Sequence, residues 1–423
     1  MRVLWVSHLV PFPPKSGPLL RAYHLIRELS RHAQVDVASF VQQTWLRGCF
    51  GDVQRGLSIA REELARFCDP RLFLPIPCEE RRFGHVRLAL RSLGGGPCFN
   101  VRWLASRPAV DALSALAASE QYDVVHFDTI SLAQFRLLFR GCPATLGHHD
   151  IESHKLMRMS QTERNPLKRL YLWQEARRLR RYEQRVIPWF DSHLTCSDVD
   201  GRRLRQIASH PSVVTVPNGV DTEYFKPGTP APVRNTLVFV ASMDFYFNED
   251  AMRFFTRAVW PALKARRPDA TLGIVGRNAP SWLTELATED PSIRVYGFVE
   301  DPRPYIEGAD LYACPIRGGG GTRLKVLDAL AMAKCIIAHP VGPEGIDVAD
   351  GKDVVLATEP REFVDRICEL LADRVRAERI GEAARALAVN VYDVRLIGRR
   401  LADHLGAIAE AGSYRAGERT CAV

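Results

Sequence analysis

The chain has 423 residues, of which 46% are hydrophobic and 25% charged, proportions that exclude a disordered or collagen-like protein and fit two folded domains. No uncharged apolar run approaches the ~18–20 residues that cross a bilayer, and the first residues do not resemble a secretory signal. Ten cysteines are scattered without a CxxC pair, so we expect reduced thiols in a cytoplasmic protein and no zinc site.

The net charge of +8 is unevenly distributed along the chain. Residues 1–225 hold 31 Lys and Arg against 22 Asp and Glu, whereas the remaining residues are close to neutral. This excess indicates an anionic partner for the first half. The sequence has no basic stripe with interleaved aromatic residues, which argues against nucleic acid as that partner. The apolar and basic stretch Arg81–Leu93 fits either contact with an anionic membrane surface or an ordinary buried helix. The arginine-rich stretch 164–185 fits either a solvated helix face or a membrane-docking surface.

The first half alternates short apolar runs with helical spacing. Residues 2–7 predict a buried strand, and a proline-rich loop that contains Gly17 leads to a helix over 19–30 and a strand over 35–40. Strand, loop, helix and strand in this order form a βαβ unit. Further strands are predicted at 123–127, 144–148 and 192–196.

A second series of the same kind follows a proline-flanked segment at 217–232. Its predicted strands are 237–241, 271–275, 293–296, 310–314 and 335–338, and its predicted helices are 249–265, 281–287 and 322–333. The sequence therefore predicts an α/β protein with two Rossmann-like, doubly wound domains, which would face each other across a cleft. The expected domains are 1–225 and 226–386, followed by a C-terminal helix over 387–410 that packs back on the first domain and a flexible tail over 411–423.

The stretch most informative about chemistry begins at the end of the predicted strand 310–314. Four glycines, 318–321, precede a predicted helix, and a glycine-rich turn at a helix N-terminus suits a phosphate. Arg323 and Lys325 lie in the first turn, where the helix dipole disfavours cations unless an anion binds. Asp328 offers acceptor oxygens for ribose hydroxyls. The alternative is a flexible glycine loop with solvated charges.

At this point the chain resembles a family. The segment GGGTRLKVLDALAMA at 319–333 looks like the donor-nucleotide motif of the retaining GT-B glycosyltransferases of family 4, and most closely like those associated with exopolysaccharide and exosortase (PEP-CTERM) systems. Further similar segments occur in the family's order along nearly the whole chain: residues 2–29, HHDIES (148–153), RRLRRYEQ (177–184), VPNGVDTEYFKP (216–227), FVASMDFYFNEDAMRFF (239–255) and YGFVEDPRPYIEGADLYACPIR (296–317).

The resemblance implies roles for individual positions. The donor diphosphate would be held by Gly17, Gly320, Gly321, Thr322, Arg323 and Lys325. The nucleotide ribose and base would be held by Asp328, Gly297, Phe298, Val299 and Arg277. In the family an acidic pair is commonly separated by seven intervening residues; here Asp328 supplies the second acid and Gly320 stands in place of the first, which leaves open how the sugar hydroxyls are held.

The resemblance also implies that histidines at strand ends contact the acceptor. His149, His126 and Asp128 are the candidate catalytic residues, and His149 leads them; a structural histidine at a strand end is the alternative. His8 would line the same region. We expect a metal-independent transfer, because cations and a helix N-terminus can stabilise the leaving diphosphate. The resemblance implies retention at the anomeric carbon. No cofactor is expected beyond the co-substrate, a UDP- or GDP-sugar.

Three functions remain open at this stage. The first is a glycosyltransferase that acts on a saccharide or lipid-linked acceptor in exopolysaccharide or cell-surface glycan synthesis, located in the cytoplasm and peripherally on the inner face of the membrane. The second is a nucleotide-sugar epimerase or hydrolase of the same architecture. The third is a non-catalytic binding protein, suggested by Gly320.

Overall fold

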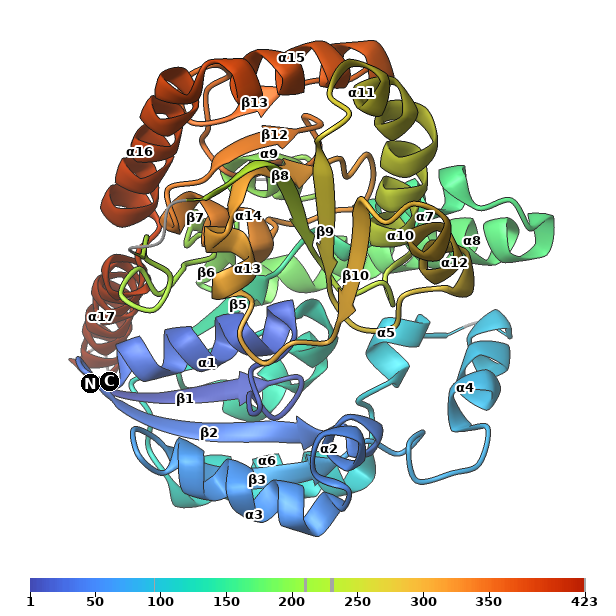
Figure 1. The fold of residues 1–423 in the computed structure, drawn as a ribbon. Coiled ribbons are helices and arrows are strands. Elements are labelled where there is room, and N and C mark those ends of the chain that lie inside the picture. The colour runs from blue at the N-terminus through green and yellow to red at the C-terminus, as the bar shows by residue number, and fades with distance from the viewer. Residues whose placement is uncertain (95, 209–210, 229–231, 422–423) are drawn as a thin grey trace. The chain divides into compact units, whose positions relative to one another are not determined.

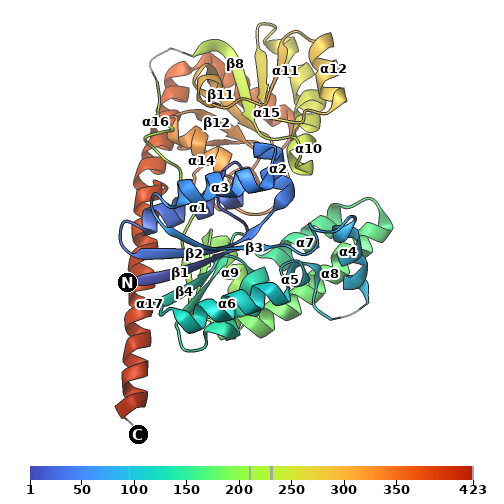
Figure 2. The same ribbon diagram turned by 90° about the horizontal axis from the view of Figure 1, so that it is seen from below.

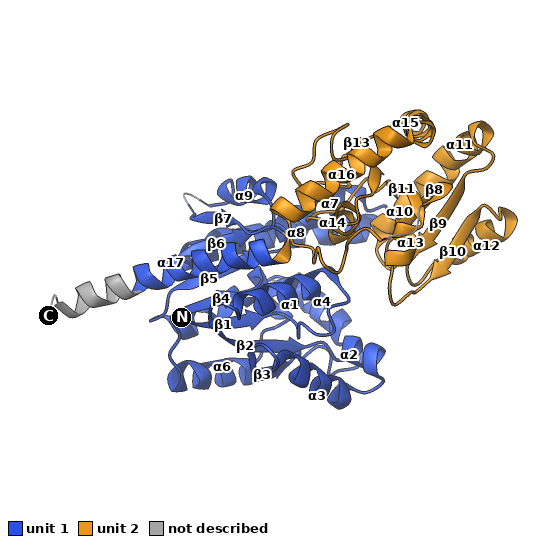
Figure 3. Ribbon diagram, turned by 60° about the vertical axis from the view of Figure 1, so that its left-hand side comes forward, with its two compact units in different colours: residues 1–217, 395–423 blue, residues 218–394 orange. Residues whose placement is uncertain are grey.

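The structure is a computed structural model that describes residues 1–423 except 95, 209–210, 229–231 and 422–423. Two compact units make up the chain (Figure 3). Unit 1 contains residues 1–217 and 395–423, and unit 2 contains residues 218–394. The boundary between them lies eight residues before the one expected at 225/226, because Asn218, Val220 and Thr222 all bond within unit 2.

Unit 1 is built on a parallel sheet of seven strands in the order β3-β2-β1-β4-β5-β6-β7 (Figure 1). The strands are β1 (Arg2–Ser7), β2 (Gln34–Val41), β3 (Asp69–Pro75), β4 (Val124–Phe127), β5 (Ala144–His148), β6 (Ser192–Thr195) and β7 (Val213–Thr215). Alternate β1 side chains enter different cores: Leu4 and Val6 join one buried cluster, and Val3 and Trp5 join another. Both faces of the sheet are therefore covered, as a doubly wound fold requires.

Helices cover the two faces of this sheet. They are α1 (Gly17–Leu29), α2 (Gln43–Phe50), α3 (Val53–Leu64), α4 (Gly84–Leu93), α5 (Phe99–Arg102), α6 (Arg107–Ser119), η1 (Ile130–Phe139), α7 (Glu152–Thr162), α8 (Pro166–Val186), η2 (Ile187–Trp189) and α9 (Asp198–Arg205). Polar caps set several of their starts: the side chains of Asp52, Ser106 and Asn165 accept bonds from the free N–H groups of α3, α6 and α8.

Unit 2 has a second parallel sheet, with six strands in the order β10-β9-β8-β11-β12-β13. The strands are β8 (Val233–Val240), β9 (Thr271–Val275), β10 (Ile293–Gly297), β11 (Ala309–Cys314), β12 (Cys335–Ala338) and β13 (Val355–Leu356). The helices are α10 (Tyr246–Phe254), the π-helical stretch η3 (Phe255–Val259), α11 (Trp260–Arg266), α12 (Ser281–Glu289), α13 (Arg303–Glu307), α14 (Leu324–Ala331), α15 (Pro360–Ala372) and α16 (Arg374–Val391). The α/β architecture predicted for both halves is confirmed.

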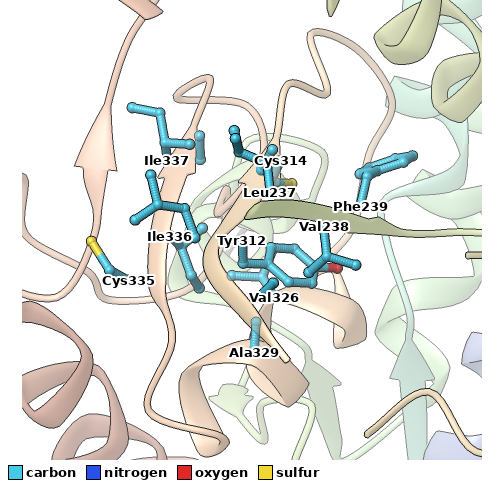
Figure 4. Close-up of a cluster of buried hydrophobic side chains, with 14 of the residues drawn as sticks. Leu237, Val238, Phe239, Tyr312, Cys314, Val326, Ala329, Cys335, Ile336 and Ile337 are labelled. Atoms are coloured by element: carbon cyan, nitrogen blue, oxygen red, sulfur yellow. The ribbon is translucent and has the colours of Figure 1, made fainter. Parts of the chain in front are cut away.

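Packing fixes α14 against the middle of this second sheet. Val326 and Ala329 point at the side chains of Val238 and Tyr312, on neighbouring strands β8 and β11 (Figure 4). All four side chains are fully or almost fully buried in the core of unit 2. The helix that follows the glycine-rich loop is therefore held by its apolar face, which leaves its N-terminus at the carboxyl end of β11.

The C-terminal part of the chain forms two helices where one was expected over 387–410. α16 ends at Val391 and α17 spans Val394–Cys421, with Tyr392 and Asp393 between them. Those two residues bond to the start of unit 2, since Val220 N donates to Tyr392 O and Thr222 Oγ1 donates to Asp393. α17 then lies along unit 1 (Figure 2), and its helical assignment extends into the stretch expected as a tail.

Each sheet reverses its direction of growth at one point. In unit 1 the chain adds β2 and β3 on one side of β1 and then places β4 on the other side. In unit 2 it adds β9 and β10 on one side of β8 and then places β11 on the other side. Open parallel sheets bind ligands beyond the carboxyl ends of their strands at such switch points. A ligand site is therefore expected at the loops after β1, β4, β8 and β11.

Candidate functional site

In unit 2 the switch point contains the glycine-rich loop. Cys314 ends β11, the loop runs to Arg323, and α14 begins at Leu324, two residues later than the sequence predicts. Gly319 has a φ of +108° and Gly321 has a φ of +73°. Residues other than glycine rarely adopt these backbone conformations. The loop conformation itself therefore requires glycine at these two positions.

A second reason for the glycines is an aromatic ring that the sequence reasoning missed. Phe247, near the start of α10, packs on the loop: a Cβ added at Gly318 would lie 2.7 Å from its ring atoms, and one added at Gly319 would lie 3.2 Å away. The first distance is too short for any side chain unless the ring moves, and the second is tighter than most Cβ contacts. Gly318 thus allows the close approach of Phe247.

Arg323 holds the loop in this shape. Its guanidinium donates to the carbonyl oxygens of Gly318 at 2.7 Å and Val341 at 2.8 Å. These bonds tie the beginning of the loop to its end and to the segment after β12. The resemblance implies that Arg323 contacts the donor diphosphate; in the structure its Nη1 and Nη2 donate to backbone carbonyl oxygens of unit 2.

Lys325 has a different environment. Its Nζ donates to Asn248 Oδ1 at 3.0 Å, and Asn248 Nδ2 donates in turn to Ser242 O at 2.6 Å. Burial lowers the pKa of Lys325 to about 8, so the side chain remains a cation at neutral pH. Within the part of the chain that the structure describes, no carboxylate lies within 4.0 Å of this ammonium. A partly buried cation without a counter-ion favours an anionic ligand.

Asp328 lies one turn further along α14, on the same face as Lys325. Burial raises its pKa to about 7, and the nearby Lys325 only partly opposes this shift. Near neutral pH its carboxyl group therefore exists in both protonation states. In either state it can hydrogen-bond a hydroxyl group, which is compatible with the expected contact to a ribose.

The remaining predicted nucleotide residues lie at the ends of β9 and β10. Gly276 N donates to Gly297 O at 2.8 Å, which brings Arg277 and the segment 297–299 to the same edge of the sheet. Arg277 Nε donates to Asp244 Oδ2 at 2.8 Å, in the loop after β8. Phe298 is 58% exposed there and Val299 is half-buried. Gly320 and Thr322 are half-buried in the glycine loop, and Thr322 O accepts a bond from Asn218.

In unit 1 the switch point brings together three titratable side chains. His8 follows β1, Asp128 follows β4 and His149 follows β5. Asp128 Oδ2 lies 3.0 Å from His8 Nδ1, and Asp128 Oδ1 lies 3.3 Å from His149 Nε2. Burial by itself would raise the pKa of Asp128, but the adjacent His149 and His8 hold it well below its ordinary value. Asp128 Oδ2 is hydrogen-bonded to His8 Nδ1, whereas His149 Nε2 lies at ion-pair distance from Oδ1 without a hydrogen-bond partner among the described residues.

Two further histidines that end strands of this sheet are part of the core. His126 is 2% exposed, its ring centroid lies 4.2 Å from that of Trp5, and its Nδ1 is 2.8 Å from Thr145 Oγ1. Burial lowers the pKa of His126 to about 3, so this ring is neutral. His148 Nε2 lies 3.2 Å from His193 Nδ1 and is equally buried. Of the predicted catalytic set, His149 and Asp128 lie together, whereas His126 has almost no surface for an acceptor. Gly17 is exposed as the first residue of α1.

The same three residues of unit 1 have the chemistry of a metal site. One ligand atom each of His8, Asp128 and His149 lies within 4.8 Å of the others, and no other group of this kind was found among the described residues. The hydrogen bond between His8 and Asp128 and the ion-pair contact of His149 with Asp128 also hold these three residues together. The expectation that the reaction needs no metal remains a prediction.

Two parallel sheets, each with polar residues gathered at its switch point, define a protein of the GT-B fold. Residues 57–224 match the family profile "Glycosyltransferase Family 4", and residues 234–373 match "Glycosyl transferases group 1". The two profiles follow each other along the chain, one in each unit. The chain belongs to the family 4 glycosyltransferases, as the motifs predict.

Curated relatives and solved structures agree with this assignment. The chain is 31% identical over 226 residues to a GDP-mannose-dependent monoacylated alpha-(1-6)-phosphatidylinositol monomannoside mannosyltransferase of Corynebacterium glutamicum, over 48% of this chain and 59% of that protein. A GDP-mannose-dependent alpha-(1-6)-phosphatidylinositol monomannoside mannosyltransferase of Mycolicibacterium smegmatis is 29% identical over 46% of this chain and 56% of its own length. The matches thus span between half and two thirds of these relatives.

The structural matches extend over almost the whole chain. Anabaena HepE, solved in complex with UDP, superposes with a TM-score of 0.66 at 16% identity and covers 96% of this chain and 100% of its own. Sucrose-phosphate synthase from Thermosynechococcus elongatus gives a TM-score of 0.69 at 14% identity, with 97% and 100% coverage. At these identities the likeness shows the fold. Among the described residues, no helix combines the length and the apolar character needed to cross a membrane.

Proposed function

We propose that the protein transfers a sugar from a nucleotide-diphosphate sugar to a saccharide or lipid-linked acceptor, in the synthesis of an exopolysaccharide or another cell-surface glycan. The donor binds at the switch point of unit 2 and the acceptor at that of unit 1. The single observation that carries the proposal is Lys325. It is a partly buried ammonium beside a glycine-rich loop and the N-terminus of α14, with no carboxylate within 4.0 Å in the described part of the chain.

The proposed chemistry follows from this charge. When the bond between the anomeric carbon and the diphosphate breaks, negative charge develops on the leaving oxygens. Lys325 and the free N–H groups at the start of α14 stabilise that charge without a metal ion. Arg323 contributes by holding the loop through Gly318 and Val341. The acceptor hydroxyl attacks on the face that the diphosphate leaves, and its proton passes to a leaving phosphate oxygen, so the anomeric configuration is retained.

His8, Asp128 and His149 orient the acceptor in this proposal. Asp128 orients both rings, through its hydrogen bond with His8 Nδ1 and its ion-pair contact with His149 Nε2. The opposite nitrogen of each ring then hydrogen-bonds sugar hydroxyls. His149, with 18% of its side chain exposed, offers more contact surface than His8.

The donor nucleotide is a uridine or guanosine diphosphate. The curated relatives are described as GDP-mannose-dependent, and HepE was solved with UDP. Calorimetric titration of the protein with UDP, GDP and their sugar conjugates would choose between them. Since the matches span only part of the curated relatives, their acceptors serve here as candidates for the acceptor assay.

Two lysines of unit 2 provide a matched test. Lys325 and Lys334 both have pKa values lowered to about 8 by burial, but Lys334 Nζ donates to the carbonyl oxygens of Glu307 at 2.7 Å and Ala309 at 2.8 Å. We expect Lys325→Met to abolish nucleotide binding and transfer while Tm stays within a few degrees. Lys334→Met should lower Tm and leave nucleotide affinity unchanged. Unchanged nucleotide affinity in Lys325→Met would overturn the donor site.

Two other functions give different results in the same assays. A nucleotide-sugar epimerase or hydrolase would convert the donor with no acceptor present, which product analysis of donor alone would detect. A non-catalytic binding protein would bind the nucleotide sugar and transfer nothing to any acceptor. This alternative is suggested by Gly320, which stands where the family commonly has an acidic residue. The transferase proposal requires a product that contains both the sugar and the acceptor.

A further inference from the structure

A cavity of about 490 Å³ opens in unit 1 beyond the carboxyl end of β3. Four arginines contribute to its lining, and among its lining residues only Glu80 carries a negative charge. The arginines are Arg81, Arg87, Arg91 and Arg102. Pro75, Cys78 and Trp103 form much of the rest of the wall.

Most of these arginines have no counter-ion of their own. In the described part of unit 1, no carboxylate lies within 4.0 Å of the side chains of Arg81, Arg87 or Arg91. Arg102 is held in place, because its Nε donates to Pro97 O at 2.8 Å. Guanidinium groups bind phosphate oxygens in pairs of parallel hydrogen bonds. A concave wall with several uncompensated guanidinium groups therefore favours a phosphate group.

The helix that supplies two of these arginines turns an apolar stripe away from the protein. Phe83, Val86, Leu90 and Leu93 are 64%, 57%, 62% and 47% exposed. Their spacing of three, four and three residues places them on one side of α4. The opposite side faces the protein, with Gly84 and Ser92 buried and Leu88 packed against the core. Arg87 and Arg91 come one residue after Val86 and Leu90, between the stripe and the cavity.

A second exposed apolar group lies at the same end of unit 1. Leu167, Leu170 and Trp173 on α8 are 78%, 59% and 41% exposed. Tyr171 OH lies 3.1 Å from Ser92 Oγ, so this part of α8 is next to α4. The guanidinium of Arg178, further along α8, also donates to Ser92 O, at the C-terminal end of α4. Exposed apolar side chains grouped on neighbouring helices and flanked by arginines are typical of a surface that inserts into the interface of an anionic bilayer.

We propose that α4 and the first half of α8 dock on an anionic membrane, and that the arginine-lined cavity takes the phosphate group of a membrane lipid that carries the acceptor sugar. The apolar stripe enters the acyl boundary, and Arg87 and Arg91 lie at the depth of the phosphates. That the bound lipid is the acceptor rests on the proposed function. The acceptor class is then a phosphorylated glycolipid. The basic stretches 81–93 and 164–185 are thereby assigned to the membrane-facing alternative.

The cavity is connected to the candidate acceptor residues. Trp103 lines the cavity, and its ring centroid lies 6.4 Å from that of His8 in an edge-on arrangement. His8 in turn contacts Asp128, and its ring centroid lies 5.5 Å from that of His149. A lipid phosphate held by the arginines therefore places the attached sugar toward the histidine cluster.

Vesicle flotation tests the surface. Wild-type protein should float with phosphatidylcholine vesicles that contain phosphatidylglycerol, and much less with phosphatidylcholine alone or at high salt. Arg87→Gln/Arg91→Gln should weaken this binding about 30-fold. The matched control is Arg399→Gln/Arg400→Gln on α17, which removes the same charge from exposed positions of the same unit. Equal losses in both variants, or wild-type protein that does not float, would overturn the docking surface.

Calorimetry with soluble dihexanoyl phosphatidic acid tests the cavity separately from the surface. Wild-type protein should bind this lipid more tightly than inorganic phosphate, and Ala105→Trp, which fills the cavity without a change in charge, should lose at least tenfold in affinity. Equal binding of lipid and inorganic phosphate, or normal binding by Ala105→Trp, would overturn the cavity assignment. Nucleotide titration distinguishes the two proposals. If wild-type protein binds no nucleotide, the proposed donor site is wrong, but the results of the two lipid assays do not depend on the donor site.

Discussion

Lys325 Nζ lies 3.0 Å from Asn248 Oδ1, a contact that joins the first turn of α14 to α10 across the switch point of the second sheet. Asn248 is 6% exposed and is itself fixed by the bond from its Nδ2 to Ser242 O. The position of the ammonium is therefore set by an amide on another element, and not by an opposite charge. An amide orients the lysine and leaves its charge available for a ligand.

Asn248→Ala should weaken nucleotide-diphosphate binding about tenfold, because Lys325 loses the acceptor that orients it. The loss of a buried hydrogen-bonded amide should also lower the free energy of unfolding by about 1–3 kcal/mol. Calorimetric titration and urea unfolding measure the two effects. Asn235→Gly, at the other end of β8, is a suitable control, since the φ of +59° there suits glycine. Normal nucleotide affinity in Asn248→Ala would show that Lys325 does not need Asn248.

Nucleotide affinity should fall as pH rises through about 8. Burial lowers the pKa of Lys325 to that value, so the ammonium is charged below it and neutral above it. Lys325→Arg keeps its charge over this range and should remove the pH dependence, even if its affinity is lower. Titrations between pH 6.5 and 9.5 provide the measurement. A wild-type affinity that is constant over this range would contradict the assignment of Lys325 to the diphosphate.

The stability of the wild-type protein relative to Asp328→Asn should decrease as pH rises from about 4 to 7. Burial raises the pKa of Asp328 to about 7 from 3.8, so the folded state binds more protons than the unfolded state in this window. The carboxyl group therefore favours folding most below pH 4, and this advantage is lost by pH 7. Urea unfolding over this range should show a change of roughly 2–4 kcal/mol in the difference between the two proteins. A constant difference would mean that Asp328 titrates normally.

Asp128→Asn should lower the transfer rate at least tenfold while nucleotide affinity stays unchanged. The amide can accept from one histidine ring but presents an N–H group to the other, which disturbs the orientation of His8 or His149. Asp123→Asn, just before β4 at its opposite end, makes the same chemical change where the carboxylate accepts from Arg2 N at 2.6 Å. Steady-state kinetics with varied acceptor should show the loss only in Asp128→Asn. Equal rates in the two variants would remove Asp128 from the acceptor site.

Gly318→Ala should cost about 1–3 kcal/mol of stability, because the new Cβ meets the ring of Phe247. Phe247→Ala removes that ring, so the double variant should be less destabilised than the sum of the two single variants. Urea unfolding of the four proteins in a double-mutant cycle measures the coupling. Additive effects would show that Gly318 is needed for a reason other than the ring.

The sequence allowed prediction of the parts of the fold that rest on local patterns. Short apolar runs and helical spacing identified the strands of both sheets that carry site loops, because buried parallel strands have few polar positions. The glycine-rich loop was located for the same reason: strand, glycines and helix are consecutive in the chain. Lys325 and Asp328 followed from their place on one helix face.

Contacts between distant segments could not be predicted in this way. Nothing local in the segment 239–255 indicates that Phe247 covers Gly318 or that Asn248 receives Lys325. Arg323 has the same charge as Lys325 and lies two residues before it, yet it bonds to backbone carbonyls. His126 and Asp128 also stand two residues apart, and only the registers of β1, β4 and β5 place one in the core and the other beside His149. These differences depend on strand order, which a single sequence does not state.

Helix α17, at the end of the chain, completes the hydrophobic core around strand β1, at its beginning. Ile397, Leu401 and Leu405 are fully buried in the same cluster as Val3 and Trp5. On the ribosome, strand β1 emerges hundreds of residues before the helix that covers it. Helix α1 covers part of this face, but the part that α17 covers stays open until synthesis is nearly complete, so a C-terminal deletion would be a folding defect of the N-terminal unit.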